Sequence, residues 1–462
     1  MRRTALVLAA GEGTRMKSHK AKVMHAVCGR PMLSWVLDAL VKVEEAGLID
    51  RILVVVGKGA PEVEQEVGGR AECVTQEERK GTGHAVMIAS PHIDADEVLV
   101  LTADSPLITP RTISDLCELH EKERPAVTVL GTELPDPTGY GRILRDGKGG
   151  VTAIVEETEA SPEQKNIKEV NTSTYVFDWA ALREVLSELS TDNAKGEYFL
   201  TDAVALLARA GGRISAFITP DASEVLGVNS REHLAEAERL MRERINRRWM
   251  EEGVTMEDPS TTFIGGDVSI GRDTVLRPLV MLEGRTVVGE GCVLGPNTRV
   301  IDSRLGDKVV VEQATVRGCE LEDGVNVGPY ASLRPGSVLG SGSKAGTFVE
   351  TKNTVVGKGS KIPHLSYMGD ADIGEDANIG AGSITCNYDG VEKHRTVIED
   401  EAFVGSDTMF IAPVRMGKGA VTGAGSAISK DIPPGALGVE RSQQKNILEY
   451  KKRVKKKEED KP

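Results

Sequence analysis

Short apolar runs alternate with longer amphipathic stretches over about the first 225 residues. The runs at 5–10, 51–57, 97–104 and 126–134 are rich in aliphatic residues and alternate little, which is typical of strands covered on both faces. The stretch 31–47 begins with Pro31 and stops at Gly47, which predicts a helix. This alternation of strands and helices predicts an open, Rossmann-like α/β sheet, whose ligands bind beyond the carboxyl ends of the strands.

A long amphipathic helix is predicted after this half. Ser230 is its expected N-cap, and the helix is expected to stop at Gly253. One side carries an apolar stripe made of Leu234, Ala237, Met241, Ile245 and Trp249, and the opposite side is heavily charged. We expect residues 229–252 to form a linker helix between a first domain at 1–228 and a second domain.

Beyond residue 260 the apolar period changes to six. Aliphatic and other apolar residues recur at every sixth position in several phases (Ile270, Leu276, Leu282, Val288, Leu294; Leu321, Val327, Leu333, Leu339, Ala345; Val356, Ile362, Met368; Ile373, Ile379; Ile398, Val404, Phe410, Met416). Glycine follows many of them. This hexapeptide pattern predicts a left-handed parallel β-helix over 253–448, with one inward residue per short strand and loops where the phase slips. The longest loop is expected near 387–397.

Composition narrows the functional classes. The 462 residues suffice for two or three domains, and the net charge of −13 argues against nonspecific nucleic-acid binding. The sequence has no apolar run long enough for a membrane span, and the N-terminal run is interpreted as a strand rather than a signal peptide. Six scattered cysteines fit reduced, buried thiols in a cytoplasmic protein. The charged tail 449–462 is expected to be disordered.

The first apolar run ends in a glycine turn, Gly11-Glu12-Gly13-Thr14-Arg15, with Lys22 behind it. Met16 stands where a dinucleotide fingerprint needs its third glycine, and no Walker sequence is present. The turn suits a triphosphate, because its N–H groups can approach an anion beside fixed positive charge. A purely structural strand–helix turn is an equal alternative on this stretch alone.

Further polar groups lie at predicted strand and turn ends. A second glycine turn, 81–83, precedes a helix, and Glu156, Asn171 and Asn229 follow or begin apolar segments. Asp104 ends an apolar strand, where a carboxylate suits Mg²⁺ together with substrate phosphates. A turn-capping role is the better interpretation of an isolated aspartate.

The second half contains one conspicuous histidine. His364 lies within a few predicted coils of Arg334, Glu350, Lys352 and Tyr367, which suggests phosphate anchoring together with proton abstraction. A structural histidine in an inert solenoid is the alternative. The other histidines have no comparable neighbours in the sequence (His19, His25, His84, His92, His120, His233 and His394).

Together these segments resemble one family in order over nearly the whole chain. The matching motifs are LAAGEGTRM, GTGHA, PTGYGRI, EYFLTD, GVNSREHLAEAE, HLSYMGDADIGEDANIGAGSITCNYDG and VGSDT. The family is the bifunctional enzyme that joins N-acetylglucosamine-1-phosphate uridyltransferase to glucosamine-1-phosphate N-acetyltransferase.

The resemblance implies two reactions and a set of residues for each. UTP and the sugar would contact Leu8, Ala9, Ala10, Gly11, Gln76, Gly81, Thr82, Gly141, Glu156 and Asn171. Arg15 and Lys22 would neutralise the triphosphate, while Asp104 and Asn229 would hold Mg²⁺.

For acetyl transfer, His364 would be the general base, with Arg334, Lys352, Tyr367 and Asn378 on the sugar phosphate. Acetyl-CoA would lie along a further set (Ala381, Asn387, Tyr388, Ser406, Ala424 and Arg441). The resemblance also implies a homotrimer, because the family builds this site from different subunits.

The chain departs from the family pattern at Ala21, Ala103 and Ser173, where the family commonly has proline, glycine and glycine. Each is expected to add a side chain close to the sugar nucleotide. Two other functions are weighed against the bifunctional enzyme: a single-activity nucleotidyltransferase with a β-helix for assembly, and a non-enzymatic scaffold. The scaffold leaves Lys22, Asp104 and Asn229 unexplained, and the single activity leaves His364 unexplained.

Overall fold

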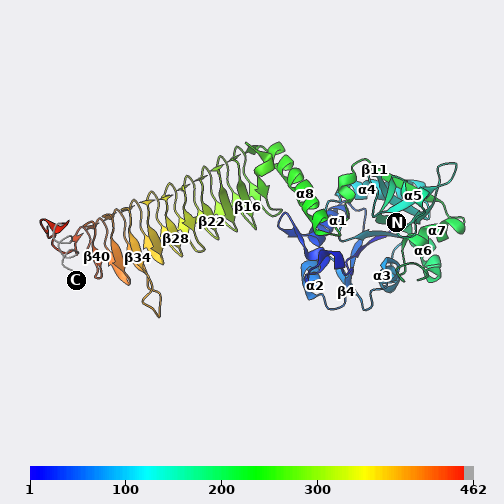
Figure 1. The fold of residues 1–462 in the computed structure, drawn as a ribbon, viewed down its shortest axis with the longest axis horizontal. Coiled ribbons are helices and arrows are strands. Elements are labelled where there is room, and N and C mark those ends of the chain that lie inside the picture. Colours follow the sequence, from blue (N-terminus) through cyan, green and yellow to red (C-terminus); the bar gives the residue numbers. More distant parts are fainter. Residues whose placement is uncertain (452–462) are drawn as a thin grey trace, which may run out of the picture. The chain divides into compact units, whose positions relative to one another are not determined.

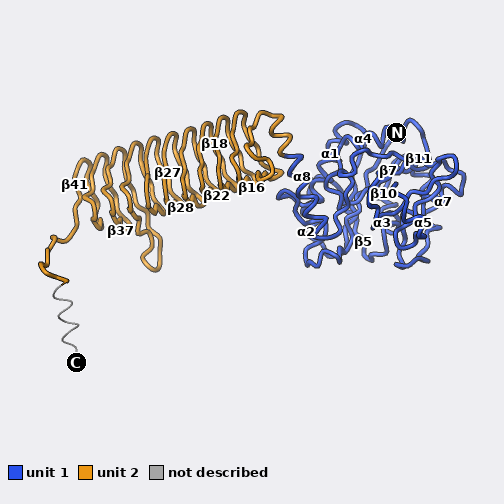
Figure 2. Tube along the Cα trace, turned by 45° about the horizontal axis from the view of Figure 1, so that its top comes forward, with its two compact units in different colours: residues 1–245 blue, residues 246–462 orange. Residues whose placement is uncertain are grey.

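The computed structural model describes residues 1–451, so most of the predicted disordered tail, 452–462, lies outside the described residues. The described chain divides into two compact units, residues 1–245 and the residues from 246 onward (Figure 2). The boundary falls inside a helix. In the described residues, no helix is long and apolar enough to cross a membrane.

Unit 1 is built on one mixed sheet with helices on both faces (Figure 1). Its strand order is β11-β7-β10-β6-β1-β4-β5, and β8 and β9 extend it beside β10. The strands are β1 (Arg3–Leu8), β4 (Arg51–Gly57), β5 (Glu72–Gln76), β6 (Glu97–Thr102), β7 (Val127–Glu133), β8 (Gly141–Arg145), β9 (Val151–Val155), β10 (Glu169–Asp178) and β11 (Ile214–Thr219). The helices are α1 (Met32–Glu45), α2 (Pro61–Val67), α3 (Thr82–Ala89), α4 (Pro110–Glu123), α5 (Pro162–Lys165), α6 (Trp179–Val185) and α7 (Thr201–Arg209). The four predicted strands and the predicted helix at 31–47 are confirmed, with small shifts at their ends.

One strand runs against the expected parallel pattern. β10 is antiparallel to both β6 and β7, whereas β1 is parallel to β4 and β6. The N-terminal end of β10 therefore lies at the carboxyl edge of its neighbours. The order reverses at β1, so the segments after β1 and β6 open at the switch point where such sheets bind ligands.

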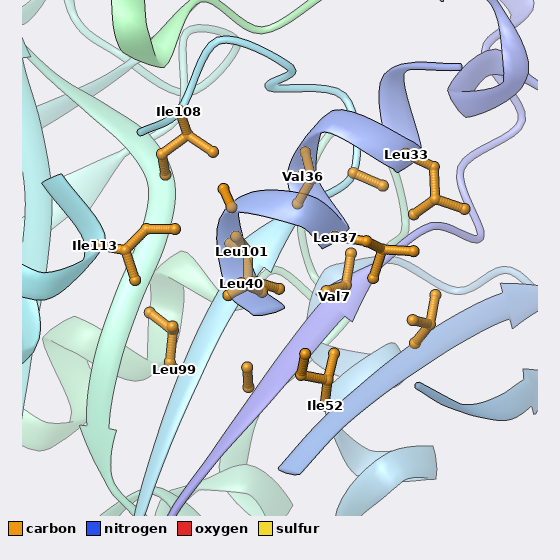
Figure 3. Packing of buried hydrophobic residues seen from close by; sticks show 14 of the residues in the cluster. Val7, Leu33, Val36, Leu37, Leu40, Ile52, Leu99, Leu101, Ile108 and Ile113 are labelled. Atoms are coloured by element: carbon orange, nitrogen blue, oxygen red, sulfur yellow. The ribbon is translucent and has the colours of Figure 1, made fainter. Parts of the chain in front are cut away.

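The sheet is packed on both faces, because successive buried residues of each strand point to opposite faces. On one face, Val7, Ile52 and Leu101 pack against Leu37 and other residues of α1, together with α2 and α4 (Figure 3). On the other face, their strand neighbours pack against α3, α6 and α7. This two-sided burial explains the continuous apolar runs and holds the carboxyl edge of the sheet in place.

The long helix α8 (Arg231–Glu251) agrees with the predicted linker. Ser230 accepts a hydrogen bond from the backbone N–H of His233 at 3.2 Å, and Gly253 follows the helix with φ 97°. Along the predicted stripe Ala237, Met241, Ile245 and Trp249 are buried, whereas Leu234 is half-buried. Glu238 accepts a hydrogen bond from the backbone of Cys28, so the first part of α8 packs on unit 1.

Unit 2 is a three-sided stack of parallel strands, consistent with the predicted left-handed β-helix. Its three sheets run from β12 (Thr255–Met256) to β41 (Leu437–Gly438), from β13 (Phe263–Ile264) to β40 (Ala427–Ile428), and from β14 (Ser269–Ile270) to β38 (Val414–Met416). We call these the first, second and third sheets. Every residue of the predicted sixth-position series is buried. The predicted loop emerges between β34 (Ile384–Cys386) and β35 (Thr396–Ile398).

All six cysteines are free thiols, and four of them are buried. Cys73 is half-buried and Cys386 is exposed, so the expectation of buried thiols is wrong at these two positions. Cys386 ends β34, a strand whose burial alternates, and its side chain falls on the outer face.

Candidate functional sites

The glycine turn after β1 is tightly folded. Gly13 has φ 63°, and a Cβ added there would lie 2.6 Å from Cβ of Lys22. Thr14–Met16 then forms one 3-10 turn, with Met16 buried. Glycine at position 13 therefore lets the turn close against Lys22 and brings that lysine to the sheet edge.

Lys22 joins three segments that are far apart in the sequence. Its ammonium donates a short hydrogen bond to Oδ2 of Asp104 and a second to Oδ1 of Asn229 at 3.0 Å. The side chains of Lys22 and Asp104 are only 12% and 14% exposed. The two oxygens predicted to hold Mg²⁺ thus converge on one cation, as a carboxylate–amide metal site requires.

The protonation of Asp104 follows from this pairing. Burial alone raises the pKa of the carboxyl, but the charge and hydrogen bond of Lys22 outweigh it and hold the pKa below its ordinary value. Asp104 is therefore an anion at neutral pH, which is the state in which a carboxylate binds a cation.

The second glycine turn folds against the segment before α7. Gly81 has φ 99°, and a Cβ there would lie 2.6 Å from the carbonyl oxygen of Tyr198. Gln76 is buried and bonds Nδ1 of His84 at 2.8 Å, while the His84 ring stacks on Tyr198. His84 therefore has a defined place beside the site, contrary to its isolation in the sequence.

Two cavities open at this edge and share Leu8, Thr82 and Asp104 as walls. The first, which we call the glycine-loop cavity, has a volume of about 500 Å³ and is lined by the two glycine turns, Lys22 and Gln76. The second, the strand-edge cavity, has a volume of about 320 Å³. Among its lining residues are Arg15, Gly141, Glu156, Asn171, Ser173 and Asn229.

Polar groups in the strand-edge cavity are held by their neighbours. Asn171 donates to the Tyr175 hydroxyl at 2.7 Å, and Thr201 donates to Glu156 at 3.1 Å. Burial raises the pKa of Glu156, although the Thr201 bond opposes the shift. Both side chains present fixed polar atoms to a small ligand.

The predicted residues of the first half gather at these cavities with one exception. Ala9 is buried, its backbone N–H bonded to Val55, and it lines neither cavity. Arg79, Thr201 and His233 line the cavities but were not predicted from the sequence. His233 lies one helical turn after Asn229, a spacing that could have pointed to it.

Of the three departures from the family pattern, only Ser173 lines a cavity. Ala103 is fully buried, and Ala21 packs against the same core. Neither alanine presents its methyl group to a cavity, so of the three departures only Ser173 places a side chain where a ligand could contact it.

In unit 2, one group of predicted residues shares the outer face of the second sheet. β25 (Ser332–Leu333), β28 (Glu350–Lys352) and β31 (Tyr367–Gly369) are neighbours in this sheet, and Glu350 pairs with Tyr367. Arg334 bonds Glu350 at 2.8 Å. A Cβ on Gly369 would lie 2.3 Å from the Tyr367 hydroxyl, so glycine at this position lets the ring fold over the backbone.

The extruded loop is held at the third sheet and brings Lys393 close to the face of the second sheet. Tyr388 and Lys393 form a bridge inside the loop, and Arg395 pairs with Asp372. Lys393 lowers the pKa of Lys352, because a second positive charge nearby disfavours the charged ammonium. Lys393 therefore lies beside Lys352, a proximity that the sequence alone does not reveal.

His364 lies at the corner between the first and second sheets, at the end of β30 (Lys361–His364). Backbone bonds stack it with the equivalent residues of successive coils. Leu365 donates to Thr347, Gly382 to His364, Asp407 to Ala381 and Gly425 to Ser406, at 2.9, 3.4, 2.7 and 2.8 Å. The predicted base and three predicted acetyl-CoA residues therefore form one column, which we call the corner column (His364, Ala381, Ser406 and Ala424).

Glycines make this column possible. A Cβ on Gly380 would lie 2.6 Å from the backbone nitrogen of Ser406, and one on Gly405 would lie 2.7 Å from that of Ala424. Arg441 closes the column by donating to the Ala424 carbonyl at 3.0 Å. The successive coils therefore approach closely, and the coils that follow His364 in the column carry only small residues there, Ala381, Ser406 and Ala424.

The remaining predicted residues lie on either side of this corner. Asn378, in β33 (Asn378–Ile379), pairs with Lys361 in the first sheet. Asn387 is buried and bonds Asp370 at 2.5 Å, whereas Tyr388 is exposed at the start of the loop. One chain thus distributes these groups over two faces, and His364 is exposed between them.

Comparison with known proteins assigns the class of unit 1. A family model described as the MobA-like NTP transferase domain matches residues 5–256. The chain belongs to this class of nucleotidyltransferases, in agreement with its mixed sheet and glycine turn.

Curated relatives match the chain over nearly its full length. A bifunctional protein GlmU from Heliobacterium modesticaldum is 52% identical over 96% of each chain. Proteins of the same name from Halalkalibacterium halodurans (47% identical, 97% of this chain and 98% of the relative) and Thermobifida fusca (50%, 96% and 92%) are similar. A solved UDP-glucose pyrophosphorylase complexed with UDP-glucose aligns over 53% of this chain and all of that chain, with 19% identity and a TM-score of 0.44. By its relatives, the chain is a member of the bifunctional GlmU family.

Proposed function

We propose that the two units perform the two reactions of UDP-N-acetylglucosamine synthesis, the function of a bifunctional enzyme of this family. Unit 2 acetylates glucosamine 1-phosphate with acetyl-CoA, and unit 1 transfers UMP from UTP to the product, releasing pyrophosphate. The observation that carries the first activity is the convergence of Lys22, Asp104 and Asn229 between two cavities.

In unit 1, UTP occupies the glycine-loop cavity and the sugar phosphate occupies the strand-edge cavity. A phosphate oxygen of the sugar attacks the α-phosphorus in line, a new P–O bond forms, and the bond to pyrophosphate breaks. Lys22 in the glycine-loop cavity and Arg15 on the wall of the adjoining strand-edge cavity neutralise the triphosphate, so the rate comes from positioning and charge neutralisation. Gln76 and Gly81 border the nucleotide, and Glu156 and Asn171 border the sugar.

Asp104 and Asn229 are the proposed Mg²⁺ ligands, because both direct oxygens at one cation, the Lys22 ammonium. Bound Mg²⁺ would offset negative charge on the phosphates. The low pKa of Asp104 keeps its carboxylate ionised for this role.

In unit 2, His364 accepts a proton from the glucosamine amine as the nitrogen attacks the thioester carbonyl, and the CoA thiolate leaves. Arg334 and Lys352 bind the sugar phosphate, with Lys393 adding positive charge. Tyr367 and Asn378 border the sugar. Acetyl-CoA lies along the corner column toward Arg441 and reaches Asn387 and Tyr388.

The acetyl-transfer site is proposed to be complete only in a homotrimer. Tyr330, Phe348 and Leu365 are 56%, 55% and 62% exposed, and the first two rings stack at 5.3 Å. All three lie at left-handed turns of the corner that carries His364. Contiguous exposed apolar groups of this kind mark protein–protein interfaces, and a neighbouring subunit there would complete the site.

We propose domain boundaries at residues 1–228 for uridylyl transfer, 229–252 for the linker helix and 253–448 for acetyl transfer. We place the enzyme in the cytoplasm, since UTP and acetyl-CoA are its co-substrates and its cysteines are free. No nucleic acid is a partner in this proposal.

The decisive assay supplies purified protein with UTP, acetyl-CoA, glucosamine 1-phosphate and Mg²⁺. The expected products are UDP-N-acetylglucosamine, free CoA and pyrophosphate, measured by chromatography and thiol titration. Uridylyl transfer from supplied N-acetylglucosamine 1-phosphate without any release of CoA would instead favour a single-activity nucleotidyltransferase.

A further inference from the structure

Ser173 adopts a backbone conformation that favours glycine. Its φ is 59°, and the pairing of β10 with β7 is interrupted between Asn171 and Thr174, so Thr172 and Ser173 form a bulge. A serine held in the left-handed region carries a steric cost that a glycine would avoid. Such outliers persist where the surroundings hold them, and bulges often redirect a side chain toward a site.

The surroundings of the bulge hold it firmly. Thr172 is buried and its hydroxyl donates to the Leu130 carbonyl at 2.8 Å. The backbone N–H of Ser173 donates to the Asn171 side chain at 3.2 Å. The inner residue of the bulge therefore anchors it, and the outer residue, Ser173, lines the strand-edge cavity.

The neighbours of Ser173 form a polar wall. Asn171 donates to the Tyr175 hydroxyl and accepts from the Ser173 backbone N–H, so it links the bulge to that buried phenol. Asn171, Ser173 and Tyr175 thus share one polar network beside Glu156. A serine hydroxyl can donate and accept at once, so Ser173 can bond a donor or an acceptor group of a ligand.

We propose that Ser173 is a specificity-determining residue whose hydroxyl hydrogen-bonds a polar substituent of the sugar 1-phosphate in the strand-edge cavity. The inference rests on the proposed uridylyl transfer of unit 1. The left-handed bulge directs the Ser173 side chain into the cavity, and the bonds of Thr172 to Leu130 and of the Ser173 N–H to Asn171 hold the bulge in place. The nucleotide, in the glycine-loop cavity, does not contact Ser173, which lines only the strand-edge cavity.

Three variants test the proposal. Ser173→Ala removes the hydroxyl and keeps the strained backbone, Ser173→Gly removes both the hydroxyl and the strain, and Ser187→Ala changes an exposed serine as a control. Loss of one hydrogen bond is expected to raise KM for N-acetylglucosamine 1-phosphate roughly 3- to 10-fold in both Ser173 variants. KM for UTP should stay within about twofold of the unmodified enzyme.

Thermal unfolding separates this role from a structural one. Ser173→Gly should have a Tm no lower than that of Ser173→Ala and still lose sugar affinity, also in direct calorimetric titration with the sugar phosphate. An unchanged KM for the sugar in Ser173→Ala, or equal increases for both substrates, would overturn the proposal while leaving the function intact. An unmodified enzyme that transfers no UMP would instead refute the function, and the role of Ser173 with it.

Discussion

Lys22→Gln removes the cation that two buried oxygens share. The Asp104 carboxylate, whose side chain is only 14% exposed, is then left with neutral partners alone. Breaking a buried ion pair by removing one partner costs about 3–5 kcal/mol, and the residual exposure here reduces this to roughly 2–3 kcal/mol. For a domain of this size, that loss lowers Tm by roughly 4–12 °C.

The double variant Lys22→Gln with Asp104→Asn gives the control. It removes both charges, so most of the lost stability should return. Uridylyl transfer should be absent in both variants, because the proposed phosphate-binding cation is missing from each and the proposed metal ligand is missing from the double variant as well. Calorimetric unfolding and a pyrophosphate-release assay measure the two properties separately.

The contribution of Asp104 to folding stability should fall as the solution is acidified. In the unmodified protein the pKa of Asp104 is below its ordinary value, so its stabilising contribution is present at neutral pH and is lost as pH falls through that lowered pKa. In Lys22→Gln, burial is opposed only by the hydrogen bonds from Thr102 and the backbone and raises the pKa of Asp104, so the destabilisation should shrink as the solution is acidified. A single variant with unchanged Tm, or a double variant less stable than the single, would refute this reasoning.

Three further predictions concern other parts of the molecule. His120 is buried with its pKa lowered from 6.5 to about 4 by burial and Arg3, so stability should fall by up to ~3 kcal/mol as pH drops across that interval. His120→Gln should lack this component in urea titrations, and parallel pH profiles would contradict it. Gly405→Ala would place Cβ 2.5 Å from the Thr422 carbonyl, so acetyl transfer should fall at least tenfold and unit 2 should lose about 1–3 kcal/mol, whereas uridylyl transfer should persist. Phe348→Glu puts a charge among the exposed side chains of Tyr330, Phe348 and Leu365 and should shift sedimentation from the proposed trimer toward monomer, with loss of acetyl transfer. Sedimentation unchanged from the unmodified enzyme would argue against this interface.

The β-helix of unit 2 could be predicted in detail, because its six-residue repeat depends only on residues that are close in the sequence. Each coil buries one residue per short strand, so the spacing alone predicts which residues of the series from Ile270 to Met416 are buried. The helix α8 was equally predictable, since Ser230 and Gly253 mark its ends within a few residues of the apolar stripe.

The arrangement of the first site required the structure. Lys22 is separated by 82 residues from Asp104 and by 207 from Asn229, and no periodicity links such positions. The antiparallel direction of β10, which carries Asn171 to the carboxyl edge, depends on pairing with β6 and β7 rather than on its own sequence. The sequence did supply the residue types, because a carboxylate ending an apolar strand and a lysine behind a glycine turn suit a phosphate site.

Side-chain direction was the weakest sequence inference. Ala103 follows a buried strand and was expected near a ligand, yet it belongs to the core. Ser173 was expected there too and does line the cavity, because the bulge in β10 changes which way its side chain faces. Cys386 was expected to be buried but falls on the outer phase of its strand.

In the proposed function, one chain carries two independent active sites. The direct measurement compares His364→Ala and Asp104→Ala in both half-reactions, with folded assembly checked by sedimentation. His364→Ala should abolish CoA release yet transfer UMP to supplied N-acetylglucosamine 1-phosphate at nearly the unmodified rate, and Asp104→Ala should do the reverse. Loss of both activities from either single substitution, in a protein whose fold and assembly are unchanged, would contradict the two-site account.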